Sequence, residues 1–155
     1  MSDSSSPLEY EYDFHPEVGQ AIEILPGLKW LRLPLPFLLG HINVWLLQDE
    51  HGGDGHGGGS NGWAIVDTGI FTSATRDVWE TTFSDSLDNA AITKVLVTHM
   101  HPDHVGCAGW LCERFDIELF MTRDEYLLCR ILVSDTGTPA PHEGRRFYQG
   151  AGFSE

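Results

Sequence analysis

Three histidines and an aspartate fall within six consecutive positions, and this run constrains the chain more than any other feature. The histidine run, as we call it, reads His99-Met100-His101-Pro102-Asp103-His104. It follows residues 92–97, an apolar segment rich in β-branched residues that predicts a buried strand. Imidazole and carboxylate groups this close together are costly in a core unless they are paired or bind a metal. The run therefore predicts a metal site at the end of a strand, whereas an isolated pair of histidines is more often a solvated loop feature.

Backbone geometry divides the histidine run into two pairs of metal ligands. His99 and His101 are two residues apart, so in an extended segment their side chains point the same way. Pro102 keeps His101 extended until the chain turns. Asp103 then falls where a helix N-cap is expected, and the turn carries His104 to another side of the site. We therefore predict one pair of His99 with His101 and a second pair of Asp103 with His104.

Two segments of the chain resemble a known family. Residues 98–106, THMHPDHVG, resemble the T-H-x-H-x-D-H-x-G pattern of the metallo-β-lactamase superfamily of metallohydrolases. Residues 62–69, GWAIVDTG, are similar to the strand ending in D-T/S-G of that family. The resemblance implies an α/β fold, the N-terminal half of a metallo-β-lactamase-like αββα sandwich, with a mixed sheet and flanking helices. It also implies that Asp67 supports the metal centre without binding the ion. Its carboxylate would accept hydrogen bonds from the ligands and so fix their orientation.

The family resemblance and the charge of the chain together predict the chemistry. Nitrogen and oxygen ligands without thiolate favour Zn²⁺, as one or two ions, with iron or manganese next. The implied activity is hydrolysis by a metal-activated water, which Asp103 would orient. A net charge of −14, from 23 acidic and 9 basic residues, should repel nucleic acids and anionic membranes. We therefore expect a small-molecule acyl substrate, an ester, thioester or lactone, as in the glyoxalase II-like branch.

The second half of the family's metal centre has no counterpart in the sequence. That half supplies another histidine to the first metal, a bridging aspartate and a final histidine, but His142 is the only histidine after His104. We therefore expect a polar lead-in at residues 1–18 and a metallo-β-lactamase-like domain at 19–155 that is incomplete at its C-terminus. Two ligands per ion predict weak metal binding. The apolar face left by the missing half predicts a homodimer.

Two alternative functions fit parts of the sequence. The chain could be a non-catalytic half-domain that binds metal weakly. It could also be an aspartic protease, since Asp67-Thr68-Gly69 and Asp135-Thr136-Gly137 share a pattern, but that class needs two similar strand and turn units and residues before Asp135 have a helical pattern. Without a signal peptide at residues 1–6 or an apolar run of membrane length, the expected location is cytoplasmic.

The remaining segments predict alternating strands and helices. Strands are expected at 21–25, 28–33, 41–47, 63–66 and 117–121, with an apolar loop at 34–40 and a glycine-rich connection at 51–62. Helices are expected at 72–87, after residue 104, from a capping box at 122–125 through 133, and at 143–148. The cysteines Cys107, Cys112 and Cys129 have no ligand spacing and are expected to be small packing residues.

Overall fold

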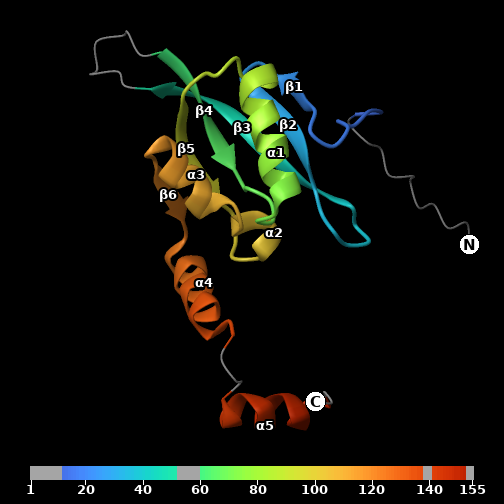
Figure 1. Ribbon diagram of the computed structural model, residues 1–155, viewed down its shortest axis with the longest axis vertical. Coiled ribbons are helices and arrows are strands. Elements are labelled where there is room, and N and C mark those ends of the chain that lie inside the picture. The colour runs from blue at the N-terminus through green and yellow to red at the C-terminus, as the bar shows by residue number, and fades with distance from the viewer. Residues whose placement is uncertain (1–11, 52–59, 138–140, 153–155) are drawn as a thin grey trace, which may run out of the picture.

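The computed structural model describes residues 12–51, 60–137 and 141–152 and is built around one sheet (Figure 1). The six strands lie in chain order, and their bounds are β1 Ala21–Leu25, β2 Leu28–Pro34, β3 His41–His51, β4 Ser60–Val66, β5 Ile92–Val97 and β6 Glu118–Met121. Most of the polar lead-in and of the glycine-rich connection lies outside the described residues.

The sheet is mixed, as expected for this α/β fold. Strands β1 to β4 form an antiparallel meander, whereas β5 and β6 run parallel to β4 and to each other. Parallel neighbours need crossovers, which the helices provide. The helical elements are α1 Ser73–Thr81, a π-helical turn η1 Thr82–Ser86, α2 Pro102–Val105, α3 Ala108–Phe115, α4 Arg123–Asp135 and α5 His142–Gly150. The chain has no helix in its described parts that is long and apolar enough to cross a membrane.

The core lies between one face of the sheet and the helices α1 and α3. Strand alternation places Leu31 and Leu33 on this face, and both are fully buried. Trp79 of α1 is also fully buried; its ring stacks on Phe83 with centroids 5.5 Å apart, and Phe83 meets Phe115 edge-on at 4.9 Å. The helical stripes predicted at 72–87 and after residue 104 are confirmed, since both pack in this one cluster.

The opposite face of the sheet has an apolar row that no helix of the core covers. Strand register places five side chains beside one another along it: Trp30, Trp45, Val66, Leu96 and Phe120. The rings of Trp30 and Trp45 stack with centroids 5.9 Å apart, and Phe120 is 46% exposed. We call this row the open face. Within the described residues, the helices that pack on the sheet, α1 and α3, lie on one side of it, which is the half-sandwich that the sequence predicted.

Three local predictions are wrong. Asp103 is not the N-cap, because His101, with an extended backbone, is the N-cap of α2. Pro102 occupies the first helical position, where an N–H would have no partner within the helix, so its absence breaks no hydrogen bond. Residues 122–125 do not form a capping box, because Thr122 makes no side-chain cap bond and Glu125 is bonded elsewhere. Pro34 belongs to β2 rather than to the loop, since it is the last residue of the strand and pairs with His41.

Gly106 is the position where the fold tolerates a side chain least. A Cβ there would lie 2.4 Å from the Pro102 carbonyl oxygen and 2.7 Å from the Phe71 nitrogen, both backbone atoms that cannot swing away. We expect Gly106→Ala to lower the free energy of unfolding by about 1–3 kcal/mol in denaturant titrations. Gly109→Ala is the control, because a Cβ at that helical glycine meets nothing within 4 Å and should stabilise by up to about 1 kcal/mol. Equal stabilities of the two variants would contradict this packing.

Candidate metal centre

The site begins where two parallel strands end side by side. Because β4 and β5 are parallel, their carboxyl ends meet at one edge of the sheet, where Asp67 follows β4 and Thr98 follows β5. Asp67 has a left-handed backbone conformation with φ 62°, which aspartate tolerates better than most residues, and its N–H donates to the Leu96 carbonyl at 2.9 Å. This turn directs a side chain that is only 5% exposed toward the histidine run.

The Asp67 carboxylate accepts hydrogen bonds from two other residues. Its Oδ1 accepts from the Thr98 backbone N–H at 2.8 Å, and its Oδ2 accepts from the Thr98 hydroxyl at 2.8 Å. Oδ2 also accepts from His104 Nδ1 at 2.9 Å. Hydrogen bonds to an ionised acceptor are stronger than neutral ones, and a nearly buried carboxylate needs them. Asp67 therefore fixes the start and the end of the histidine run at once.

This network sets the tautomers of two histidines. A carboxylate oxygen accepts hydrogen bonds, so the contact at 2.9 Å is a donation from His104 Nδ1, and in the neutral ring the lone pair is then on Nε2. The single hydroxyl proton of Thr98 is donated to Asp67, so the Thr98 oxygen accepts from His99 Nδ1 at 3.0 Å. His99 is then also protonated at Nδ1, with its lone pair on Nε2. One carboxylate thus favours the same tautomer in two imidazoles, with the lone pair on Nε2.

All four predicted ligands lie close together. His99 Nε2 is 3.0 Å from His101 Nδ1, and the ring centroids of His99 and His104 are 3.9 Å apart. Asp103 Oδ2 lies 3.7 Å from His104 Nε2. The ring of His99 is nearer to that of His104 than to that of His101, whose centroid is 4.6 Å away, so the division into two ligand pairs stays a prediction. Among the described residues, no group of three or more His, Cys, Asp or Glu is arranged to hold a metal ion.

A second set of contacts, absent from the sequence prediction, fixes α2 against the turn after β4. The Thr68 N–H and hydroxyl both donate to the His104 carbonyl, at 2.8 and 2.7 Å, and the Thr68 hydroxyl accepts from the Cys107 N–H at 3.1 Å. Thr68 is fully buried. The D-T-G pattern at residues 67–69 was the only indication of this role in the sequence. Burial raises the pKa of the Cys107 thiol to about 11, which suits the packing role predicted for it.

A third contact joins the histidine run to α4. The Glu125 carboxylate accepts a hydrogen bond from the Met100 backbone N–H at 2.8 Å. Met100 lies between His99 and His101, so α4 is fixed beside the first ligand pair. The capping-box prediction was wrong for this reason, because Glu125 is bonded to a distant N–H and not to the start of its own helix.

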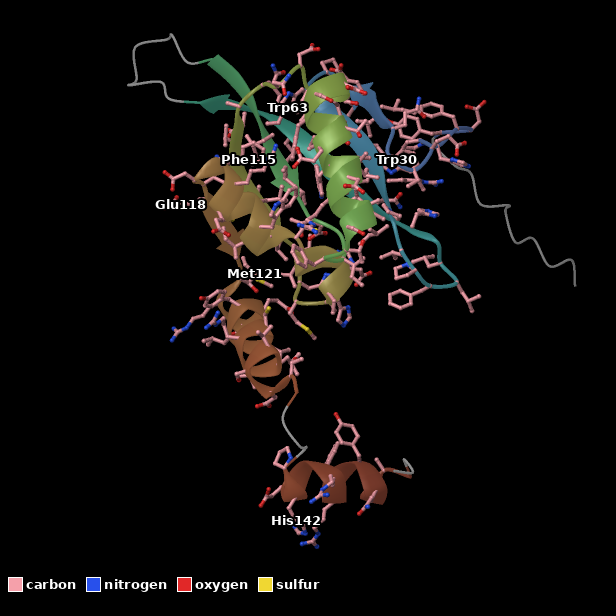
Figure 2. All side chains as sticks on the ribbon, viewed as in Figure 1. Trp30, Trp63, Phe115, Glu118, Met121 and His142 are labelled. Carbon is pink, nitrogen blue, oxygen red and sulfur yellow. The ribbon has the colours of Figure 1, made fainter. Side chains whose placement is uncertain are left out.

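Other candidate residues lie elsewhere. His142 is the first residue of α5, and Figure 2 shows it apart from the sheet. Asp135 ends α4, whereas Asp67 follows a strand, so the two similar strand and turn units of an aspartic protease are missing and that alternative is wrong.

The fold defines a class of protein, an α/β half-sandwich with a mixed sheet and flanking helices. A family model described as the metallo-beta-lactamase superfamily matches residues 37–146. The chain belongs to the metallo-β-lactamase superfamily. A search of curated proteins found no match.

Solved structures with the same fold include a beta-lactamase domain protein from Burkholderia ambifaria, 46% identical, with a TM-score of 0.70 over 79% of this chain and 36% of that one. A metallo-beta-lactamase family protein from Thermus thermophilus is 29% identical, with a TM-score of 0.54 over 79% of this chain and 42% of that one. The metallo-beta-lactamase FIM-1 from Pseudomonas aeruginosa, solved in a mono-zinc form, is 19% identical, with a TM-score of 0.52 over 72% of this chain and 45% of that one. The chain therefore spans less than half the length of these three proteins.

Proposed function

We propose that the chain is a zinc-dependent hydrolase unit that acts on a small ester, thioester or lactone, as in the glyoxalase II-like branch of its superfamily. The observation that supports this most is the hydrogen-bond network of Asp67, which places the lone pairs of neutral His99 and His104 on Nε2, where His99 Nε2 faces His101 Nδ1 at hydrogen-bond distance, 3.0 Å. Such preparation is typical of histidines that bind metal, whose other ring nitrogen donates to an acceptor.

The distances between donor atoms fit a metal ion. Two nitrogens on one tetrahedral zinc, with bonds of about 2.0–2.1 Å, lie about 3.3 Å apart. His99 Nε2 and His101 Nδ1 are 3.0 Å apart, and His104 Nε2 and Asp103 Oδ2 are 3.7 Å apart, so both pairs fall near this value. His99 with His101 would hold one ion and Asp103 with His104 a second, while iron or manganese could replace zinc on the same donors.

The residues of the chain have distinct roles in the proposed reaction. The chemistry that zinc supplies when bound is the activation of a water molecule near neutral pH and the polarisation of a carbonyl group. The Asp103 side chain is 30% exposed, so its carboxylate can accept a hydrogen bond from that water and orient it. Asp67 touches neither water nor substrate and is a positioning residue. The net charge of −14 supports a small acyl substrate and opposes polyanions.

The function is tested on metal-stripped chain reloaded with zinc, with zinc content and hydrolysis of S-hexanoyl-N-acetylcysteamine as two readouts. We expect wild type to retain zinc and to hydrolyse the thioester. A chelator should abolish this hydrolysis. His101→Ala should lower zinc affinity at least tenfold, because it removes one of two ligands. His142→Ala, on α5, is the matched histidine control and should behave as wild type.

Each outcome of this test separates the candidate functions. Turnover that survives chelation, or His101→Ala with wild-type zinc affinity, would contradict a metallohydrolase. Zinc retention without any turnover would instead establish the non-catalytic half-domain, which is favoured by one observation: within the described residues, no group of three or more His, Cys, Asp or Glu is arranged to hold a metal ion.

We also propose that a second copy of the chain covers the open face. Its apolar row crosses five strands from Trp30 to Phe120, and a partly exposed apolar row of this length favours association, although Phe120 is the one exposed side chain among the five. Light scattering should give twice the monomer mass of 17.3 kDa, and Trp45→Glu should return the chain to monomer because it places a charge in the row. A wild-type monomer at all concentrations would contradict the dimer.

A further inference from the structure

Arg32 of β2 is a cation whose guanidinium group is held in place beside the open face. Leu31 and Leu33 are buried in the core, so strand alternation directs Arg32 to the opposite face, next to Trp30. Its Nε donates to Asn43 Oδ1 at 3.3 Å, and its guanidinium carbon lies 5.3 Å from the centre of the Trp30 ring. The Trp30 indole N–H donates to the same Asn43 oxygen at 2.9 Å. The amide and the ring therefore orient the guanidinium together.

The two terminal Nη groups of Arg32 are left for a ligand. Within the parts of the chain that the structure describes, they make no hydrogen bond, and the ion pairs there involve Lys94, His104 and Arg114 but not Arg32. A guanidinium without a carboxylate partner is unexpected in a chain with 23 acidic and 9 basic residues. Its planar fork of N–H donors matches a carboxylate, which it can bind through two parallel hydrogen bonds.

Two histidines lie near this guanidinium. In the register of β2 and β3, Arg32 pairs with Asn43 and Pro34 with His41, so Arg32 and His41 are diagonal neighbours on one face, with Cα atoms about 7–8 Å apart. Burial and then the nearby charges of Arg32 and His15 lower the pKa of His41 below its ordinary value. The His41 ring is therefore neutral near pH 7 and can donate one N–H. We call Arg32, His41 and His15 the basic cluster.

We propose that the basic cluster binds the carboxylate group of a small monocarboxylate, with Arg32 as its bidentate partner and His41 as a further donor. The stacked rings of Trp30 and Trp45 adjoin Arg32 and Asn43 along the strands, so a short hydrocarbon group on the ligand has apolar surface to contact. The net charge of −14 opposes polyanions such as nucleotides. This site goes beyond the proposed hydrolysis and needs no metal.

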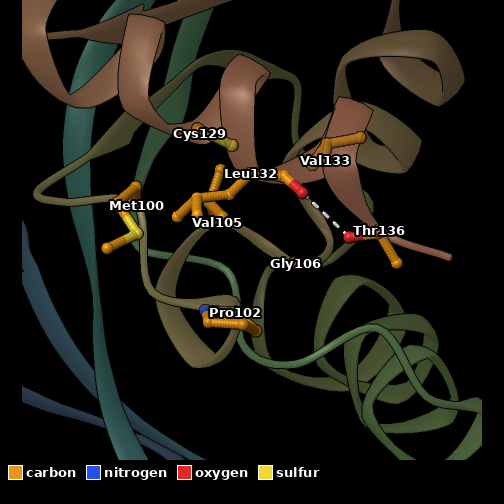
Figure 3. A pocket seen from close by; sticks show the side chains of 8 residues that line it. All are labelled: Met100, Pro102, Val105, Gly106, Cys129, Leu132, Val133 and Thr136. Carbon is orange, nitrogen blue, oxygen red and sulfur yellow. Dashed lines mark hydrogen bonds between the residues drawn. The ribbon is translucent and has the colours of Figure 1, made fainter. Parts of the chain in front are cut away.

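An apolar pocket elsewhere in the chain provides the contrast for the test. A pocket of about 310 Å³ lies between the histidine run and α4, with Met100 on one side and Leu132 on the other (Figure 3). No charged side chain is among the described residues that line it. A ligand held there by its hydrocarbon group would bind no worse as a neutral amide than as a carboxylate. Butyrate and butyramide, which are similar in size, therefore distinguish the two sites.

Proton–nitrogen NMR spectra of the metal-stripped chain measure binding at the N–H groups of the basic cluster. Titration with butyrate at constant ionic strength should shift the Arg32 Nε–H and Trp30 indole N–H signals until they saturate, whereas butyramide should leave them unchanged. Two internal references should not shift with either ligand. One is Arg114, whose guanidinium is already paired with Glu80 at 2.6 Å, and the other is the indole N–H of the fully buried Trp79.

Two arginine variants separate a bidentate site from general attraction of anions. Arg32→Lys keeps the charge but loses the fork, so butyrate binding followed at the Trp30 signal should weaken by about fivefold or more. Arg130→Lys, on the exposed surface of α4, is the matched control and should bind as wild type. An equal response to butyramide, wild-type affinity in Arg32→Lys, or no saturable shift in wild type would overturn the proposal. Loss of the butyrate response as protein concentration rises would also overturn it, because a second copy would then occupy the cluster.

Discussion

The buried carboxylate of Asp67 is the interaction on which the rest of the site depends. It lies at the junction of two parallel strands, and its oxygens accept hydrogen bonds from the residue that follows β5 and from the last histidine of the run. A carboxylate that is 5% exposed is costly unless donors surround it, and here the donors are the groups that must be oriented. Stability of the fold and orientation of the imidazoles are therefore provided by the same hydrogen bonds.

Three further contacts, at Thr68, Glu125 and Gly106, also hold the histidine run in place. Thr68 binds the His104 carbonyl from the turn after β4, and Glu125 binds the Met100 N–H from α4. Close approach of backbones at Gly106 leaves no room for α2 to shift. Rigid support of this kind is what a metal site needs, because ligands must be held near their bound geometry before the ion arrives. The short helix α2 is thus placed by its neighbours rather than by its own helical propensity.

Sequence reasoning predicted the features that local periodicity determines. The strand at 92–97 occurs in the structure, and the side chains of His99 and His101, which alternation places on one side, lie within hydrogen-bond distance. Their role as a pair of metal ligands stays a prediction. The contacts that it missed join residues far apart in the chain, such as Thr98 with Asp67 and Met100 with Glu125. Glu125 matched a local capping pattern, but its carboxylate accepts a hydrogen bond from the Met100 backbone N–H, which is distant in the sequence. Local patterns cannot rank such competing partners, because the competitor is brought near only by the tertiary fold.

We infer that Asp67 sets the tautomers of the imidazoles before any metal binds. Long-range proton–nitrogen NMR spectra of the metal-stripped chain measure this directly, because they distinguish protonated from unprotonated ring nitrogens. We expect His99 and His104 to be protonated at Nδ1 in wild type, and Asp67→Asn to disturb both. Asp116→Asn, at another aspartate of positive φ, should change neither. Protonation at Nε2 in the wild-type chain, or spectra that Asp67→Asn leaves unchanged, would contradict it.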